Sequence, residues 1–160
     1  MLTSITNYGL TDIMEGFRYL LRKAELSEEV RTLAVQITQN GNDISAIYDW
    51  VKANLRYVPD PVRGMGDVEL FISPARQVKD YNAGLAIAGD CDDFALLTVA
   101  LCRAVGIRAN IVLLDTIDNG IDHAIAEVYS EKLERWIMLD ATGECLPLGW
   151  LESYYERIIV

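Results

Sequence analysis

Three residues of the chain have the types and the order that cysteine-based acyl transfer requires: Cys91, His123 and Asp140. Cys91 lies in the run GDCDDFALLTVALCRAV, and His123 is the only histidine in the chain. A thiolate is a nucleophile, an imidazole can accept its proton, and a carboxylate can hold the imidazole in the correct tautomer. These residues predict a Cys-His-Asp triad if the fold brings them together.

The residues around Cys91 predict a helix that begins at the thiol. Asp90 is a good N-cap, the helix dipole favours carboxylates at Asp92 and Asp93, and Gly106 is a natural C-terminal stop. A thiol at a helix N-terminus can have its pKa lowered from about 8.5 to roughly 3.5–7.5. The neighbouring aspartates oppose this effect because negative charge disfavours a thiolate. A cationic partner is therefore needed, and His123 is the candidate.

Two strand-like runs on either side of the polar link Ser130–Leu133 predict a β-hairpin that contains both His123 and Asp140. The runs are Ala124–Tyr129 and Glu134–Asp140. If Tyr129 pairs with Glu134, the register places His123 directly opposite Asp140. Directly opposed residues have Cβ atoms about 4.5–5.5 Å apart, so the imidazole and the carboxylate could form a hydrogen bond.

The other elements follow from helical spacing, turn residues and prolines. Expected helices are Thr11–Leu26 behind a Thr11 cap, a second from Ser27 to Gly41, a third from Asn42–Asp43 to Leu55, and a short one over Ala75–Lys79. The remaining expectations are a long loop over Pro59–Pro74, a strand over Arg108–Asp115 and a short helix over Trp150–Tyr155.

The order and spacing of these motifs resemble the transglutaminase-like superfamily of papain-related cysteine enzymes. The matching residues are Gly89-Asp90-Cys91, Arg103-Ala104-Val105-Gly106-Ile107, His123-Ala124 with Glu127-Val128-Tyr129, Trp136 to Asp140 with Ala141-Thr142, and the upstream segment Ala46–Pro61. The chain departs from the family at Ile125, where relatives often have tryptophan, and at Ala141, where they often have proline. Neither departure removes a catalytic group.

The resemblance implies an α+β fold with a papain-like core. In such a core, helices pack on an antiparallel sheet and the nucleophile lies at the N-terminus of the central helix. The oxyanion-hole side chain is open, because no glutamine shortly precedes Cys91 as in papain-type enzymes. Some relatives use an upstream aromatic residue, so Tyr57 and Tyr81 are candidates beside the backbone N–H of Cys91.

The resemblance implies acyl transfer from a peptide or protein substrate, with Cys91 as nucleophile, His123 as general base and acid, and Asp140 fixing its tautomer. Hydrolysis by a protease or amidase is the first expectation, because water is always present. A transglutaminase would share the first half-reaction. A non-catalytic binding or structural module on the same fold, of phage or mobile-element origin, is a further alternative, although a complete triad argues against it.

Length and composition predict a single domain over 1–160, because 160 residues with 51% hydrophobic side chains can bury one core. Its expected parts are a helical N-terminal layer (1–56), a loop-rich entry (57–88) and the catalytic core (89–145). The formal charge of -10 disfavours nucleic acid and anionic membranes as partners. The start of the sequence lacks a basic-then-apolar signal and no apolar run reaches about 18 residues, which predicts a cytoplasmic protein.

No cofactor and no metal are expected. The cysteines Cys91, Cys102 and Cys145 are odd in number and form no C-x-x-C pair, which argues against a disulfide framework or a zinc site. Cys102 is expected to be a core residue. The aspartates near the site suggest a cation site, but they lack a recognised loop spacing. They are Asp90, Asp92, Asp93, Asp115, Asp118 and Asp122.

Overall fold

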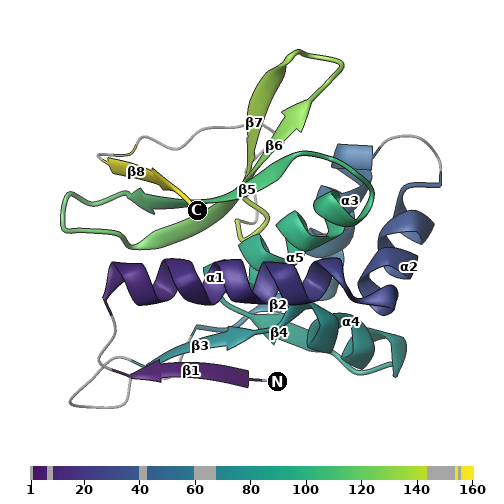
Figure 1. Ribbon diagram of the computed structural model, residues 1–160, viewed down its shortest axis with the longest axis horizontal. Helices are drawn as coiled ribbons and strands as arrows, with labels where there is room; N and C mark the ends of the chain where they lie inside the picture. The colour runs from purple at the N-terminus through teal and green to yellow at the C-terminus, as the bar shows by residue number, and fades with distance from the viewer. Residues whose placement is uncertain (1, 7–8, 40–42, 60–67, 144–153, 155) are drawn as a thin grey trace.

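The computed structural model describes residues 2–6, 9–39, 43–59, 68–143, 154 and 156–160. Figure 1 shows a twisted sheet on one side of the central helix α5, and the other helices on its remaining sides. The helices are α1 (Leu10–Glu25), α2 (Glu28–Ile37), α3 (Asp43–Asn54), α4 (Pro74–Asn82) and α5 (Cys91–Ala104). The strands are β1 (Leu2–Thr6), β2 (Leu55–Tyr57), β3 (Val68–Ile72), β4 (Ile87–Gly89), β5 (Ala109–Asp115), β6 (His123–Ser130), β7 (Arg135–Leu139) and β8 (Glu156–Ile159).

Helix α5 is the centre of the core, and every residue from Asp92 to Cys102 is buried. A helix that is apolar on all sides is stable only when other elements surround it. The helix begins at Cys91, and its N-cap Asp90 accepts a hydrogen bond from the Asp92 N–H at 3.2 Å. It ends before Gly106, whose φ of +82° is a left-handed conformation that favours glycine. The predicted start, cap and stop of this helix are confirmed.

Arg103 ties the end of α5 to its surroundings. Its Nε donates to the Ala109 carbonyl at 2.9 Å, and its Nη1 donates to Glu25 of α1 at 3.3 Å. The arginine near the end of this helix therefore links α5 to the first residue of β5 and to the helical layer.

The main sheet has the strand order β7-β6-β5-β8, and each neighbouring pair is antiparallel. One face, including Ile111 and Ala126, belongs to the core that contains α5. Val112 and Ile125 belong to a smaller cluster, against which Tyr154 packs. The expected α+β fold, with helices packed on an antiparallel sheet, is confirmed.

The predicted hairpin register is wrong by two residues. Ser130 pairs with Arg135, so Ser130 belongs to β6 and the connecting turn is 131–134. The Ser130 hydroxyl accepts from the Leu133 N–H at 3.2 Å, and Glu134 has a left-handed φ of 52°. A shift of two residues preserves the face on which each side chain lies. His123 and Asp140 are therefore not directly opposed, but they remain on one face.

Two small sheets were not expected. β1 pairs antiparallel with β3, and β2 pairs parallel with β4. β3 lies within the segment Pro59–Pro74, so the prediction that this whole segment is a loop is wrong at its C-terminal end. Its partner strand lies at the start of the chain, and local turn signals carry no information about such a distant pairing.

The N-terminal helices form where they were predicted, with two differences: α2 ends at Ile37 and not at Gly41, and one cap is wrong. Gly9 is the N-cap of α1, and the Asp12 carboxylate accepts from the Gly9 N–H at 2.8 Å, so the Thr11 cap is wrong. Ser27 caps α2 as predicted, accepting from the Val30 N–H. The predicted helix over Trp150–Tyr155 lies outside the described residues except for Tyr154. No helix in the described ranges combines the length and apolar character of a membrane span.

Candidate active site

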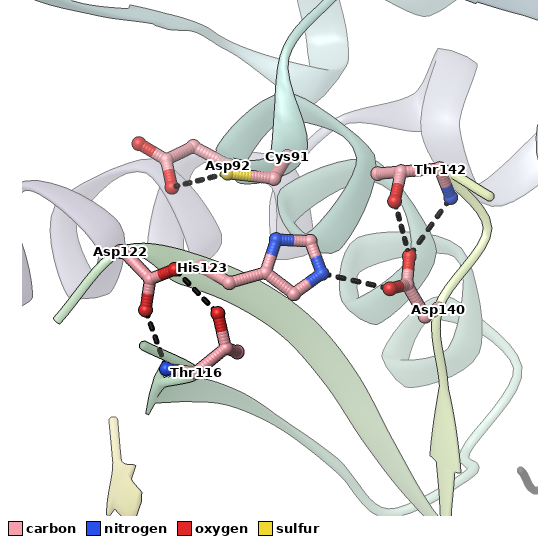
Figure 2. A network of polar contacts seen from close by, with 7 residues as sticks. All are labelled: Cys91, Asp92, Thr116, Asp122, His123, Asp140 and Thr142. Carbon is pink, nitrogen blue, oxygen red and sulfur yellow. Dashed lines mark hydrogen bonds and ion pairs between the residues drawn. The ribbon is translucent and has the colours of Figure 1, made fainter. Parts of the chain in front are cut away.

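Cys91 and His123 line one pocket of about 260 Å³ between the start of α5 and the main sheet. Figure 2 shows the thiol above the imidazole ring, on the side of Nδ1. The other residues that line the pocket are Ile13, Asp90, Asp92, Leu113, Ile121 and Asp122. The structure therefore brings together a helix start and a strand start that are separated in the sequence by the rest of α5, by β5 and by the loop that follows β5.

The opposite edge of the His123 ring contacts Asp140. His123 Nε2 and Asp140 Oδ2 lie 2.7 Å apart, with 18% and 11% of the two side chains exposed. An ionised carboxylate can only accept hydrogen bonds, so in the neutral ring Nε2 carries the proton. The lone pair of Nδ1 is then directed toward the thiol side of the pocket, as a base for that thiol requires.

Thr142 holds the other oxygen of the Asp140 carboxylate. Its backbone N–H donates to Asp140 Oδ1 at 2.9 Å, and its hydroxyl donates to the same atom (Figure 2). Burial raises the pKa of Asp140. The hydrogen bonds from His123 and Thr142 lower it by a larger amount, so the net pKa is below the usual value. Asp140 is therefore ionised throughout the neutral pH range.

Negative charge lies close to the thiol. Cys91 Sγ is 3.8 Å from Asp92 Oδ1, and Asp90 and Asp92 are both buried. One ligand atom from each of Asp90, Cys91 and Asp92 lies within 4.8 Å of the others. These carboxylates disfavour a thiolate, so a Cys91 thiolate would need the helix N-terminus and a protonated His123 to offset them.

Tyr57 is the one of the two aromatic candidates that lies near this site. Burial raises the pKa of its hydroxyl, and the charges of Cys91 and Asp90 raise it further. β2 pairs with β4 so that Tyr57 is opposite Gly89, and the Val58 N–H donates to the Gly89 carbonyl at 2.8 Å. Tyr81 of α4 instead packs edge-on against Trp50, with ring centroids 4.8 Å apart.

The loop between β5 and His123 is organised by Asp115, a role that sequence reasoning missed. Asp115 Oδ1 accepts from the Ile117 and Asn119 N–H groups, and Oδ2 accepts from the Gly120 N–H. Asp122 accepts from Thr116 at the other end of the loop (Figure 2). An aspartate at a strand end, followed closely by a turn signal, was the available evidence for this arrangement.

We expect Asp115 to make stability depend on acid pH. Burial raises the pKa of Asp115. The backbone N–H donors of the loop lower it by a larger amount, so the net pKa lies below the usual value of about 3.9. A lowered native pKa stabilises the fold above the unfolded pKa, and this contribution is lost as the pH falls through the native pKa. Asp115→Asn should therefore lower the urea midpoint at neutral pH and flatten its decline in acid.

The control for this prediction is Asp118→Asn. Asp118 is exposed and has a φ of 59°, which asparagine also tolerates. Equal acid dependence of the two variants would contradict the role of Asp115.

Cys102 is fully buried, and burial raises its pKa to about 12. A thiol with such a pKa is unreactive near neutral pH. Cys102 is thus a core residue, as predicted, whereas Cys91 is partly exposed. Cys145 lies outside the described residues.

Comparison with known proteins links this geometry to a family. The sequence pattern of the transglutaminase-like superfamily matches residues 31–141. The fold is similar to a structure named "Putative Cysteine Protease from Cytophaga hutchinsonii", with 21% identity and a TM-score of 0.57, over 99% of this chain and 62% of that one. It is also similar to a "putative protease" from Parabacteroides distasonis, with 15% identity and a TM-score of 0.52, over 77% and 25% of the two chains.

The chain thus spans less than two thirds of the length of either structure, at 62% and 25%. No significant match was found among curated protein sequences. At these identities the two structures establish a shared fold, and the chemistry depends on the residues of this chain.

Proposed function

The chain belongs to the transglutaminase-like superfamily, and from this membership we propose that it is a cysteine-dependent hydrolase of peptide or amide bonds. One observation carries the proposal. His123 shares a pocket with Cys91 while its Nε2 is 2.7 Å from the Asp140 carboxylate. This arrangement supports Cys91 as nucleophile, His123 as general base and acid, and Asp140 as the group that orients the ring.

In the first half-reaction, the Cys91 thiol transfers its proton to His123 Nδ1, and the sulfur attacks the carbonyl carbon of the substrate. The tetrahedral intermediate then collapses, and His123 gives the proton to the leaving amine as the C–N bond breaks. The products of this step are a free amine and a thioester on Cys91. Asp140 stabilises the imidazolium that exists between the two proton transfers.

In the second half-reaction, water attacks the thioester. His123 Nδ1 accepts a proton from the water and returns one to the Cys91 sulfur as the C–S bond breaks, which releases a carboxylic acid. A transglutaminase would use an amine in place of water. Hydrolysis is the first choice because it requires no site for a second substrate.

The Tyr57 hydroxyl is a candidate donor to the oxyanion of the tetrahedral intermediate. The charges around Cys91 raise the pKa of the Tyr57 hydroxyl. The residue after Tyr57 donates a backbone hydrogen bond to Gly89, two residues before the nucleophile. The backbone N–H of Cys91 at the start of α5 is the second candidate donor. Donors directed at the developing negative charge stabilise the transition state more than the substrate.

We expect Tyr57→Phe to lower kcat by roughly 10²-fold with little change in KM, because one oxyanion donor is typically worth about that much. The measurement is steady-state hydrolysis of a peptide substrate. Tyr81→Phe is the matched control, since it removes the same hydroxyl from a ring that packs against Trp50. A Tyr57→Phe enzyme with the wild-type kcat would exclude this hydroxyl as an oxyanion donor.

The proposed function is tested by incubating the chain with a peptide mixture in oxygen-18 water, with and without methylamine, and analysing the products by mass spectrometry. Cys91-dependent hydrolysis with label in the new carboxylate is expected. Predominant methylamide products would favour the transglutaminase alternative. Products that persist in Cys91→Ala would overturn the proposed mechanism, and no turnover together with an unactivated thiol would favour a non-catalytic module.

A further inference from the structure

Asp93, two residues after Cys91, is a fully buried carboxylate outside the proposed triad. It has 0% exposure, and its Oδ1 accepts a hydrogen bond from the Ile72 N–H at 2.7 Å. Ile72 is the last residue of β3. This hydrogen bond therefore fastens the first turn of α5 to a strand that is distant in the sequence.

Gly89 leaves the space that the Asp93 carboxylate occupies. A Cβ atom at position 89 would lie 2.3 Å from Asp93 Oδ2 and 2.4 Å from Asp93 Cβ, far closer than atoms can approach. The Gly89 carbonyl in turn accepts from the Val58 N–H. Asp93 is thus enclosed by the end of β3 on one side and the end of β4 on the other.

From this enclosure we infer that Asp93 is a positioning residue for the Cys91 thiol, and this inference rests on the proposed function. Cys91 follows Gly89 and precedes Asp93 within the same short stretch. The hydrogen bond from Ile72 and the close packing against Gly89 together restrict how the first turn of α5 can rotate. Asp93 acts through the backbone of this turn, which directs the sulfur to the Nδ1 side of His123.

The positioning role and a simple charge effect predict opposite results. The Asp93 carboxylate is close to the thiol in sequence, so if only its charge mattered, removing it would favour the thiolate and speed alkylation at neutral pH. If it positions the turn, removing it lets the sulfur move away from His123 and slows alkylation. Small misplacements of reacting atoms can cost about 10²-fold in rate.

The test compares Asp93→Ala with Asp93→Asn. The alanine variant loses the acceptor for Ile72, and we expect its kcat to fall by roughly 10²-fold with KM little changed. The rate at which iodoacetamide alkylates Cys91 in this variant should rise only at higher pH than in the wild type. Asparagine keeps an oxygen for the Ile72 N–H, so most of the rate should remain, and this rescue would not occur if the negative charge itself were required.

Thr98→Val is the matched control, because it also removes a buried polar group from α5. Thr98 is 1% exposed, and its hydroxyl donates to the Phe94 carbonyl of the same helix at 2.8 Å. The variant should lose stability without changing the pH profile of Cys91. Gly89→Ala is a second probe, because its methyl group would displace the Asp93 carboxylate, and it should reproduce the Asp93→Ala profile.

Faster alkylation in Asp93→Ala at neutral pH, or a profile identical to wild type, would overturn the inference. Failure of the proposed function would be recognised separately, because His123→Ala would then leave Cys91 reactivity unchanged in the parent chain. In that case amide hydrogen exchange decides the positioning role. Asp93→Ala must speed exchange at Ile72 and in residues 92–94, whereas Thr98→Val must not, and unchanged exchange would refute the inference.

Discussion

Replacing Cys91 with alanine is expected to reduce hydrolysis to background, a loss on the order of 10⁶-fold in kcat, as for loss of the nucleophile in a related triad mechanism. The same change should abolish iodoacetamide labelling near neutral pH. The physical reason is that Cys91 is the partly exposed thiol at a helix start beside an imidazole, whereas Cys102 is buried with its pKa raised to about 12. Mass spectrometry of the labelled peptides measures both the site and the rate.

The controls for this experiment are the other two cysteines. Cys102→Ala and Cys145→Ala should leave neutral labelling and turnover intact. Faster labelling of Cys145 than of Cys91 in the wild-type chain would show that the nucleophile has been assigned to the wrong residue.

The second large effect is expected for Asp140→Asn. The side-chain amide can donate to His123 Nε2, which would place the ring proton on Nδ1 and remove the base that faces the thiol. The amide also no longer stabilises the imidazolium. The corresponding change in a serine triad costs about 10⁴-fold in kcat, and we expect a loss approaching that size here.

The pH profile of Cys91 alkylation separates this role from a structural one. If Asp140 orients His123, the profile of Asp140→Asn should move to higher pH, because the imidazolium that pairs with the thiolate has lost its carboxylate. If Asp140 only supports the local fold through its bonds with Thr142, the variant should lose stability and the profile should not move. An unchanged profile in a folded variant would leave at most a Cys-His dyad.

Asp80→Asn is a suitable control for Asp140→Asn because it makes the same chemical change in a surface ion pair. Asp80 Oδ2 is 2.7 Å from Arg76 Nε on α4, and such surface pairs contribute little to the free energy of unfolding. It should leave both turnover and the alkylation profile unchanged.

The start of α5 could be predicted because its determinants are local. Asp90 caps the helix through a hydrogen bond to a residue two positions away, and Gly106 ends it through its own backbone conformation. Both signals act over a few residues, so they can be read without knowing what packs against the helix. The existence of the hairpin is local in the same way, and it is what brought Asp140 into the prediction.

The hairpin register could not be predicted from the sequence, because the alternation of side chains between the two faces repeats every two residues. A shift of two leaves every side chain on its own face, so the pattern could not distinguish Tyr129 opposite Glu134 from the observed pairing with Trp136. The shift changed the contact from directly opposed to offset. His123 and Asp140 still meet at 2.7 Å because they remain on one face.

By itself, the sequence predicted Cys91, His123 and Asp140 as the candidate triad, the helix that begins at the thiol and the α+β class, since each depends on local chemistry or on the spacing of motifs. Only the tertiary structure distinguished Tyr57 from Tyr81 and placed Asp93 against Ile72. Those outcomes depend on β2 pairing with β4 and on β3 lying beside the start of α5. The β2–β4 pairing uses backbone hydrogen bonds, and the Asp93 carboxylate binds a backbone N–H of β3. Any residue except proline can donate such an N–H, so these contacts leave little trace in side-chain patterns.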